Sequence, residues 1–231
     1  MPNLCIIPAR GGSKRIPRKN IKDFLGKPII AYSIEAALKS ELFDEVMVST
    51  DDAEIAEVAI KYGAKVPFTR SKKNSNDFAT TFEVIEEVVL KYKTLGLIFE
   101  YTCCLYSCAP FVTSIKLCKS FETMLNGKFD SVFPVMAFGS PIQRALKLRN
   151  DKKTDFYYPE HSLARSQDLV PSFHDAGQFY WMATEKCLGQ KKIITNNTGS
   201  IIISEIEGQD IDNEIDWKLA ELKHELLQSI K

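Results

Sequence analysis

The sequence predicts an α/β protein built on a mostly parallel sheet. Short apolar runs alternate with helix-like patterns along most of the 231 residues, an order typical of a parallel sheet covered by helices. Hydrophobic residues make up 45% of the chain, which at this length is enough for one sizeable core. Polar turns directly follow the predicted strands, and in such sheets ligands bind beyond the carboxyl ends of the strands. We therefore expect one shared edge to collect the turns at 10–20, 49–52, 70–71 and 107–110.

The predicted strands are short and apolar. The first, at residues 4–7, leads directly into two glycines, and the second, at 45–49, is dominated by Val46, Met47 and Val48. Similar apolar runs predict further strands at 65–68, 98–105, 131–135, 178–182 and 200–203.

The predicted helices begin at residues suited to a first helical turn. Pro28 opens a helix to about residue 39, because a proline there loses no hydrogen bond. Asp51, followed three residues later by an acid, is expected to cap a helix over 52–61. Further helices are expected at 80–92 and from Thr113 to about 125. The last helix, at 213–230, is expected to bury a stripe made of Ile215, Leu219, Leu222, Leu226 and Ile230.

Residues 139–175 differ from the rest of the chain. This stretch is polar, lacks regular periodicity and is interrupted by Pro141, Pro159 and Pro171. We predict a single domain over 1–231 in which about 139–175 is an inserted lobe outside the core.

Charge and composition exclude several classes of partner. Thirty basic and thirty acidic residues cancel, so no overall field would recruit nucleic acid or an anionic membrane. No apolar run reaches the roughly 20 residues that span a bilayer, and we expect no signal peptide. In that context the six cysteines are expected to be reduced thiols of a soluble, cytoplasmic protein.

The most informative segment is the loop after the first strand. Gly11 and Gly12 would let backbone amides approach an anion, and the cations around them would neutralise it: Arg10, Lys14, Arg15, Arg18 and Lys19. The spacing fits neither a Walker A loop nor a dinucleotide fingerprint. A basic surface loop beside a tight turn is the simpler alternative. We favour a triphosphate cradle, because the segment begins directly after an apolar strand.

A second chemical signal is the pair Asp210 and Asp212. In an extended segment, residues two apart point to the same side, so both carboxylates can face one cation. Such a pair, with no histidine or cysteine nearby, suits Mg²⁺ held partly by substrate phosphates. Taken alone, it could equally be the polar start of the next helix. The predicted cradle favours the metal interpretation, because a nucleotide site needs a divalent ion.

Other polar residues are less specific. Arg70 follows a predicted strand and could contact a base or a phosphate, or could lie on the surface. Polar and aromatic residues gather at 143–144, 165–168 and 174–181, which is typical of a pocket for a charged, hydroxylated small molecule. Each of them could instead serve only to hold the lobe together.

At this point the motifs resemble a known family, the acylneuraminate cytidylyltransferases or CMP-sialic acid synthetases. The resemblance covers nearly the whole chain and is carried by residues 6–14, 16–17, 19–20, 25–28, 48–51 and 209–216. The chain departs from the sialic-acid branch at 106–110 and 174–181. There, and at 141–146 and 165–169, it resembles the branch that acts on pseudaminic acid.

The resemblance implies a fold and an activity. The fold would be the three-layer nucleotide-diphospho-sugar-transferase type, with a mostly parallel central sheet and a small dimerisation lobe. The implied reaction joins CTP and a nine-carbon 2-keto sugar acid, pseudaminic acid, to give the CMP-sugar and pyrophosphate for bacterial surface or flagellar glycosylation. The implied partners are these small molecules and a second copy of the chain, paired through the lobe.

The resemblance also assigns roles to residues. Arg10 and Lys19 would hold the phosphates, with Lys19 nearest the α-phosphoryl group, and the rest of the cradle would comprise Ala9, Gly11, Gly12 and Ser13. Ribose and cytosine would be contacted by Asn20, Arg70 and Thr80. Asp210 and Asp212 would bind Mg²⁺, which would also lower the pKa of the attacking hydroxyl. The sugar would be bound by Arg165, His174, Gln178 and Tyr180.

Several alternatives stay open at this point. The preferred sugar could be N-acetylneuraminic or legionaminic acid. A metal-dependent glycosyltransferase would place its Asp-x-Asp after a middle strand, but that region has the single acid Asp130. A non-catalytic regulator would bind CTP without cleaving it.

Overall fold

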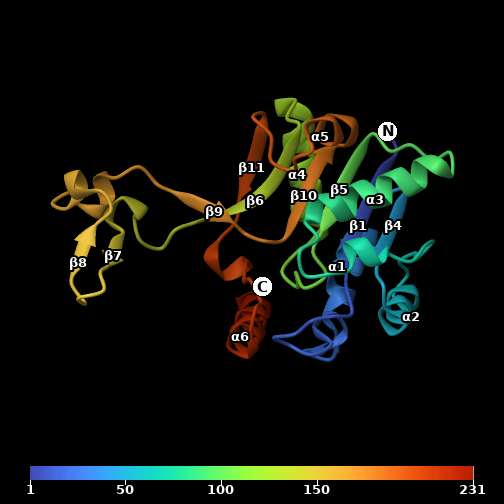
Figure 1. Cartoon of the computed structure of the whole chain (residues 1–231), viewed down its shortest axis with the longest axis horizontal. Coiled ribbons are helices and arrows are strands. Elements are labelled where there is room, and N and C mark those ends of the chain that lie inside the picture. Colours follow the sequence, from blue (N-terminus) through green and yellow to red (C-terminus); the bar gives the residue numbers. More distant parts are fainter. Residues whose placement is uncertain (231) are drawn as a thin grey trace.

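The computed structural model describes residues 1–230, which form three layers around one seven-stranded sheet (Figure 1). Across the sheet the strands run β11 (Thr198–Ile202), β6 (Ser131–Ala137), β10 (Phe179–Ala183), β5 (Tyr101–Leu105), β1 (Asn3–Pro8) and β4 (Glu45–Ser49). The short β9 (Phe173–Asp175) also pairs with β6. β1 is parallel to β4 and β5, and β11 is parallel to β6, whereas β10 is antiparallel to both of its neighbours. The prediction of a mostly parallel sheet is confirmed.

Helices cover both faces of this sheet because its strands are apolar on both sides. On β1, Cys5 and Ile7 pack towards α1 (Ile29–Ser40), α2 (Ala53–Lys61) and α4 (Ser114–Gly127). The alternate residues Leu4 and Ile6 pack towards α3 (Thr81–Thr94) and α5 (Thr184–Gln190) on the opposite face. The carboxyl ends of β1 and β5 lie at one edge of the sheet, between the two layers of helices.

A third apolar cluster joins the two ends of the chain below the sheet. The segment after β1 contains the 3-10 turn η1 (Lys19–Ile21) and the hairpin of β2 (Asp23–Phe24) and β3 (Lys27–Pro28). Ile16 and Phe24 from this segment pack with Ile211 and with Trp217 of α6 (Glu214–Ile230). The cluster therefore fixes the start of α6 against the loop after β1.

The prediction for the buried face of α6 is wrong. Trp217 and Ala220 are buried, whereas the predicted stripe is exposed at every position: Ile215, Leu219, Leu222, Leu226 and Ile230. These two sets lie on opposite sides of an α-helix. The single large ring of Trp217, 1% exposed, packs against Phe24 and sets the rotation of the helix in place of the longer aliphatic stripe.

Three further details of the secondary structure differ from the predictions. The segment 65–68 is not a strand; Lys65 makes only an isolated bridge to Met47. β5 begins at Tyr101 rather than at 98, where Ile98 is exposed. The cap of α2 is Asp52, whose side chain accepts a hydrogen bond from the amide of Ile55, and not Asp51.

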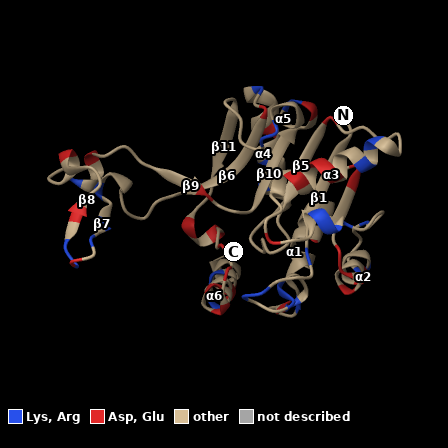
Figure 2. Cartoon of the chain, viewed as in Figure 1, with Lys and Arg blue, Asp and Glu red and all other residues tan. Residues whose placement is uncertain are grey.

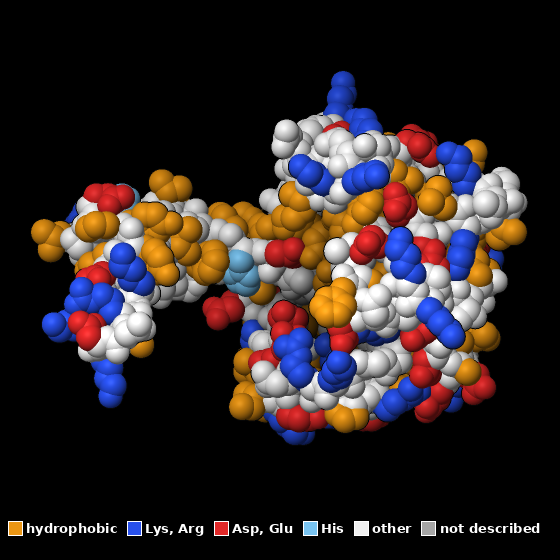
Figure 3. All heavy atoms as spheres, in the orientation of Figure 1, with side chains coloured by type: hydrophobic (Ala, Val, Ile, Leu, Met, Phe, Trp, Pro, Cys, Tyr) orange, Lys and Arg blue, Asp and Glu red, His pale blue; other side chains and the backbone are white. Residues whose placement is uncertain are grey.

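A lobe stands apart from the three layers (Figure 1). It carries β7 (Leu146–Leu148), β8 (Thr154–Phe156) and the 3-10 turns η3 (Ile142–Arg144), η4 (Pro159–His161) and η5 (Ser166–Asp168). None of the residues from 137 to 175 is buried. Figure 3 shows apolar side chains across its surface, and those most exposed include Leu148, Leu163 and Val170. Within residues 1–230, no helix is both long enough and apolar enough to cross a bilayer.

Candidate functional site

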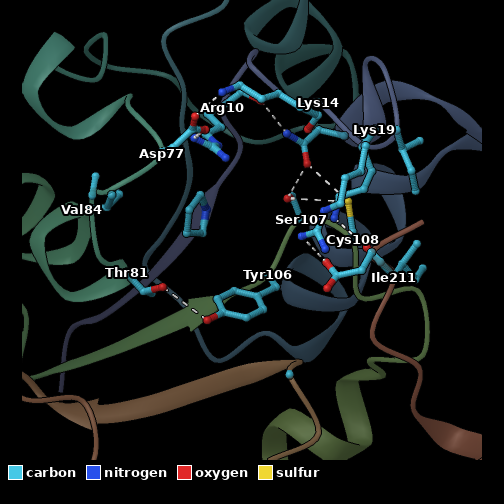
Figure 4. A pocket seen from close by; sticks show the side chains of 18 of the residues that line it. Arg10, Lys14, Lys19, Asp77, Thr81, Val84, Tyr106, Ser107, Cys108 and Ile211 are labelled. Carbon is cyan, nitrogen blue, oxygen red and sulfur yellow. Dashed lines mark hydrogen bonds and ion pairs between the residues drawn. The ribbon is translucent and has the colours of Figure 1, made fainter. Parts of the chain in front are cut away.

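Segments far apart in the sequence meet in one cavity at the carboxyl ends of β1 and β5. The cavity has a volume of about 510 Å³ and is walled by the loop after β1, the segment before α3, the turn after β5 and the segment before α6 (Figure 4). Figure 2 shows basic residues gathered on the loop after β1. The predicted convergence of turns is confirmed for three of them, since Arg10, Arg70 and Ser107 all line this cavity. The fourth turn, 49–52, lies outside the cavity lining. Its side chains accept hydrogen bonds from the loop, at Gly11, and from Arg70.

The predicted site residues divide into two groups. Those that line the cavity are Arg10, Ser13, Lys19, Asn20, Arg70, Asp210 and Asp212. Those outside its lining are Ala9, Gly11, Gly12, Thr80, Arg165, His174, Gln178 and Tyr180. The carboxylates from the end of the chain thus share one cavity with the cations from its beginning.

The loop after β1 is tied to the turn after β4 by acidic side chains. The amide of Gly11 donates to Asp51 Oδ1 at 3.0 Å, so the acid that does not cap α2 instead holds this loop. A Cβ atom at Gly11 would lie 2.6 Å from Asp52 Oδ2, so a larger residue there would force the Asp52 side chain to shift. Arg18, in the left-handed region with φ of 56°, donates to both Asp52 and Glu54. These contacts fix both ends of the loop.

The cations inside the cavity are also paired with protein groups. Asp77 accepts from Arg10 at 2.6 Å and from Lys14 at 2.5 Å, and these contacts with Lys14 and Arg10 lower the pKa of Asp77. Arg15 donates to Asp212 at 2.8 Å. Lys19 Nζ donates to the carbonyl of Ile211 at 2.7 Å. An anionic ligand entering the cavity would compete with these partners.

Asn20 links the loop to the turn after β5. Its Nδ2 donates to the carbonyl of Arg10 at 2.8 Å, while its Oδ1 accepts from Ser107 Oγ at 2.8 Å and from Cys108 Sγ at 3.3 Å. Burial raises the pKa of Cys108 to about 11, so this residue is a neutral thiol at physiological pH. Asn20 therefore positions two walls of the cavity relative to each other.

Arg70 is a buried member of the cavity wall and not a surface residue. It is 6% exposed, donates from Nε to Ser49 Oγ at 3.0 Å and also donates to the carbonyl of Ser49. Burial lowers its pKa from the ordinary value of an arginine. A buried guanidinium at the end of β4 gives the cavity a fixed positive charge.

The segment before α3 supplies residues that the sequence analysis missed. Asn74, Asp77 and Thr81 line the cavity, and the hydroxyls of Thr81 and Tyr106 lie 3.3 Å apart. Thr80, which was predicted to bind nucleotide, caps α3 through a reciprocal pair of contacts with Glu83. Short polar segments of this kind give no periodic signal; the position after Arg70 and before a capping box is the only clue in the sequence.

Asp210 and Asp212 lie on either side of the buried Ile211. Ile211 is 2% exposed and packs in the cluster with Ile16 and Trp217, and it lines the cavity together with its two neighbours. Burial and the charge of Asp212 raise the pKa of Asp210. No group of three or more His, Cys, Asp or Glu side chains that could hold a metal ion occurs within residues 1–230.

The four predicted sugar ligands lie outside this cavity. Tyr180, on β10, is buried and donates to Asp175 Oδ2 at 2.6 Å, and Gln178 donates to the carbonyl of Glu207 at 2.7 Å. His174 lies on β9, beside the start of the lobe. Arg165 lies on the lobe itself and pairs with Asp168. Between them, Gly177 does line the cavity, so the 174–180 segment borders the predicted nucleotide site.

Comparisons with known proteins cover nearly the whole chain. The family model described as Cytidylyltransferase matches residues 4–207. A pseudaminic acid cytidylyltransferase of Campylobacter jejuni is 42% identical over 98% of this chain and 97% of its own length. A CMP-N,N'-diacetyllegionaminic acid synthase of Legionella pneumophila is 30% identical over 97% of each chain. A solved structure of CMP:2-keto-3-deoxy-manno-octonic acid synthetase complexed with CTP, 18% identical, has a TM-score of 0.71 over 99% of this chain and all of that one, which shows a shared fold.

Glu87 of α3 holds the segment that carries Asn74, and its replacement should destabilise the protein in a pH-dependent way. Hydrogen bonds from Lys91, Ser71 and Asn74 outweigh the effect of burial and lower the pKa of Glu87 from 4.5 to about 2. Glu87→Gln should lower the free energy of unfolding by about 1–3 kcal/mol at pH 7. Because the folded-state pKa is depressed, this contribution is complete above pH 4.5 and is lost as the pH falls towards 2.

Urea denaturation of the wild type and the variant at a series of pH values measures this difference. The gap between the two free energies of unfolding should close over the window from pH 4.5 to 2. Glu86→Gln, on the same helix, is the matched control. A gap that stays constant across the window would contradict the assignment.

Proposed function

The chain belongs to the cytidylyltransferase family, and on that premise we propose that it transfers the cytidylyl group of CTP to pseudaminic acid. The observation that carries the proposal is the single cavity that joins Arg10 and Lys19 to Asp210 and Asp212. The sugar assignment is supported by 42% identity to the Campylobacter jejuni pseudaminic acid enzyme, against 30% to the legionaminic acid enzyme.

The proposed reaction is an in-line displacement at phosphorus. The anomeric hydroxyl oxygen of the sugar acid bonds to the α-phosphorus of CTP, and the bond from that phosphorus to the oxygen bridging to the β-phosphate breaks. The proton of the hydroxyl passes to solvent water, and the products are the CMP-sugar and pyrophosphate. Such a step depends on alignment and on stabilisation of charge, and it needs no covalent intermediate with the protein.

Cations from the loop after β1 would hold the phosphates. Lys19 is fixed by the carbonyl of Ile211, next to the two acids, which suits it to the α-phosphoryl group. Arg10 and Lys14 lie near the Asp77 side of the cavity and suit the β- and γ-phosphates that leave as pyrophosphate. Ser13 lines the same wall. Gly11 and Gly12 would act through the shape of the loop, and Ala9 through its buried packing at the end of β1.

The nucleoside would lie against the wall formed by Arg70 and the start of α3. Arg70 presents a buried positive charge there, and Thr81 is the threonine in the cavity lining. Thr80 would act one step removed, by capping the helix that carries Thr81. Asn20 would position the loop against Ser107.

Asp210 and Asp212 would hold Mg²⁺ together with the phosphates of CTP. Two carboxylates in the lining of one cavity fit this ion, which takes oxygen ligands and is typically shared between one or two acids, substrate phosphates and water. Burial, together with the charge of Asp212, raises the pKa of Asp210, and a cation bound beside both acids would stabilise their charged forms. Bound there, Mg²⁺ would offset the charge that develops on the phosphoryl oxygens. Arg15 would have to release Asp212 as the ion enters.

The sugar acid would bind beside the nucleotide, along the 174–180 segment. Gly177 already borders the cavity, and Tyr180 and Gln178 hold the polar segment around it through Asp175 and Glu207. His174 lies at the outer end of the same segment. Arg165 lies on the lobe, away from the cavity of its own chain, so a role in sugar binding would require the lobe of a second copy.

We further propose that the lobe forms a homodimer. Leu148, Leu163 and Val170 are 73%, 96% and 76% exposed, and no residue from 137 to 175 is buried, so the lobe has apolar surface without a core of its own. A second copy would cover this surface. CTP as substrate and the free cysteines favour the cytoplasm as the compartment, which cell fractionation would test.

Light scattering should give a mass of twice 26.1 kDa for the protein at micromolar concentration. Leu163→Asp should shift the protein towards the monomer, because the exposed leucine would no longer bury apolar surface. Leu222→Asp, on the exposed face of α6, is the control and should leave the mass unchanged. A wild type that remains monomeric would refute the dimer.

Release of pyrophosphate tests the reaction itself. The protein should release it from CTP and Mg²⁺ in the presence of pseudaminic acid, with kcat/KM at least about tenfold above that for legionaminic or N-acetylneuraminic acid. No release with any of the three acids would refute the enzyme. A preference for another acid would refute the sugar assignment alone.

Asp210→Asn should lower kcat by about 100-fold or more, because the charge of the metal stabilises the transition state. Binding of CTP without metal should remain, and the stimulation of binding by Mg²⁺ should disappear, as measured by calorimetry. Glu185→Gln removes one exposed acid far from the cavity and should change neither. A regulator that only binds CTP would show no turnover in either protein and no dependence on Asp210.

A further inference from the structure

Asp77 bridges two cations of the proposed phosphate site with its two carboxylate oxygens. Oδ1 lies 2.6 Å from Arg10 Nη1, and Oδ2 lies 2.5 Å from Lys14 Nζ. Figure 4 shows Asp77 beside Arg10 in the cavity wall. Two anionic oxygens held between a guanidinium and an ammonium group are the arrangement that a phosphate group would adopt at the same place.

The ion pairs of Asp77 are weak enough for a ligand to displace it from Arg10 and Lys14. The side chains of Arg10, Lys14 and Asp77 are 35%, 77% and 41% exposed. Ion pairs this exposed are weak, because water screens them and two flexible side chains must be ordered to make them. The contacts with Lys14 and Arg10 keep the pKa of Asp77 low, so the carboxylate is charged at neutral pH.

The backbone on either side of Asp77 is anchored independently of these ion pairs. Ser71 and Asn74 are held by Glu87 of α3, and Thr80 is held by the capping contacts with Glu83. Asn76 Oδ1 accepts from the amides of Phe78 and Ala79. The side chain of Asp77 can therefore leave Arg10 and Lys14 without loss of the hydrogen bonds that shape the segment.

From these contacts we infer that Asp77 is an internal counter-anion of the pyrophosphate-binding half of the site. It occupies Arg10 and Lys14 in the empty protein, is displaced by the β- and γ-phosphates of CTP, and returns as pyrophosphate leaves. The inference rests on the proposed function for the identity of the ligand. Its consequence is that the protein binds both CTP and pyrophosphate less tightly than its cations alone would allow, which favours product release.

The opposite interpretation is that Asp77 only orders Arg10 for its ligand. The two interpretations predict opposite changes in phosphate affinity for the same variant. If Asp77 competes with phosphate, Asp77→Asn frees both cations and tightens binding. If Asp77 only orients Arg10, the same variant weakens binding.

Calorimetric titration without divalent metal separates these outcomes, with CTP, pyrophosphate and CMP as probes. Asp77→Asn should bind CTP and pyrophosphate about fivefold to tenfold more tightly than the wild type, and pyrophosphate should become a correspondingly stronger product inhibitor. Binding of CMP should change by less than about twofold, because its single phosphate lies on the Lys19 side, away from Asp77. Glu185→Gln, which also removes one acid paired with a lysine, should leave all three affinities unchanged.

Three results would overturn the inference. These are unchanged or weaker binding of pyrophosphate by Asp77→Asn, tightening of CMP equal to that of pyrophosphate, and equal tightening by Glu185→Gln. Asp77→Ala repeats the test with a side chain that cannot hydrogen-bond, and thermal melting of both variants verifies the fold. A wild type that binds CTP while the variants do not differ from it refutes only the counter-anion. A wild type that binds no CTP, with pyrophosphate binding still tightened by Asp77→Asn, supports the counter-anion and refutes the nucleotide function.

Discussion

The apolar contact between the loop after β1 and the segment that leads into α6 is the constraint on which the site depends. Ile16 from the loop after β1 and Ile211 from the segment before α6 are 1% and 2% exposed and share one cluster with Trp217. Because Ile211 packs in this cluster, Asp210 and Asp212 on either side of it are held at the cavity, whose lining includes all three residues. Charged groups separated by almost the whole sequence are thus brought together by hydrophobic burial, which salt and ligand hardly affect.

Electrostatic balance is the second constraint, because a cavity rich in cations must remain folded when it is empty. The structure meets this requirement by giving the cations of the loop acidic or carbonyl partners. Arg18 has its partners, Asp52 and Glu54, outside the cavity lining, and these contacts shape the loop. Arg15 and Lys14 have exposed partners inside the cavity, and these can be exchanged for a ligand. Ion pairs therefore shape the loop outside the cavity, and inside it they influence how strongly a ligand binds.

Much of this arrangement is predictable from the sequence, and the exceptions have physical reasons. The strands, the helices of the core and the convergence of the loop with Arg70 and Asp210 follow from apolar periodicity and from the rule that ligands bind at the carboxyl ends of strands. The rotation of α6 could not be predicted in this way. Periodicity gives every apolar residue equal weight, whereas burying the ring of Trp217 stabilises the helix position more than burying several leucines would. The separate uses of Asp51 and Asp52 could not be predicted either, since either acid can cap a helix and only the position of Gly11 decides between them. Asp77 lies in a segment without periodicity, so the sequence offered no face on which to place it. Thr81 begins α3, and helical periodicity alone does not show that the first residue of a helix faces a cavity.

The place of β10 in the sheet has a consequence for how the chain is made. This strand lies between β5 and β6 and pairs with both, yet it follows them in the sequence, after the whole lobe. A growing polypeptide that ends before Phe179 has no partner for either strand along those edges, and unpaired strand edges are prone to join other chains. The ribosome must therefore deliver some four fifths of the protein before the middle of its sheet can close. Gly177, which borders the ligand cavity, directly precedes this strand, so that part of the cavity wall is also made late.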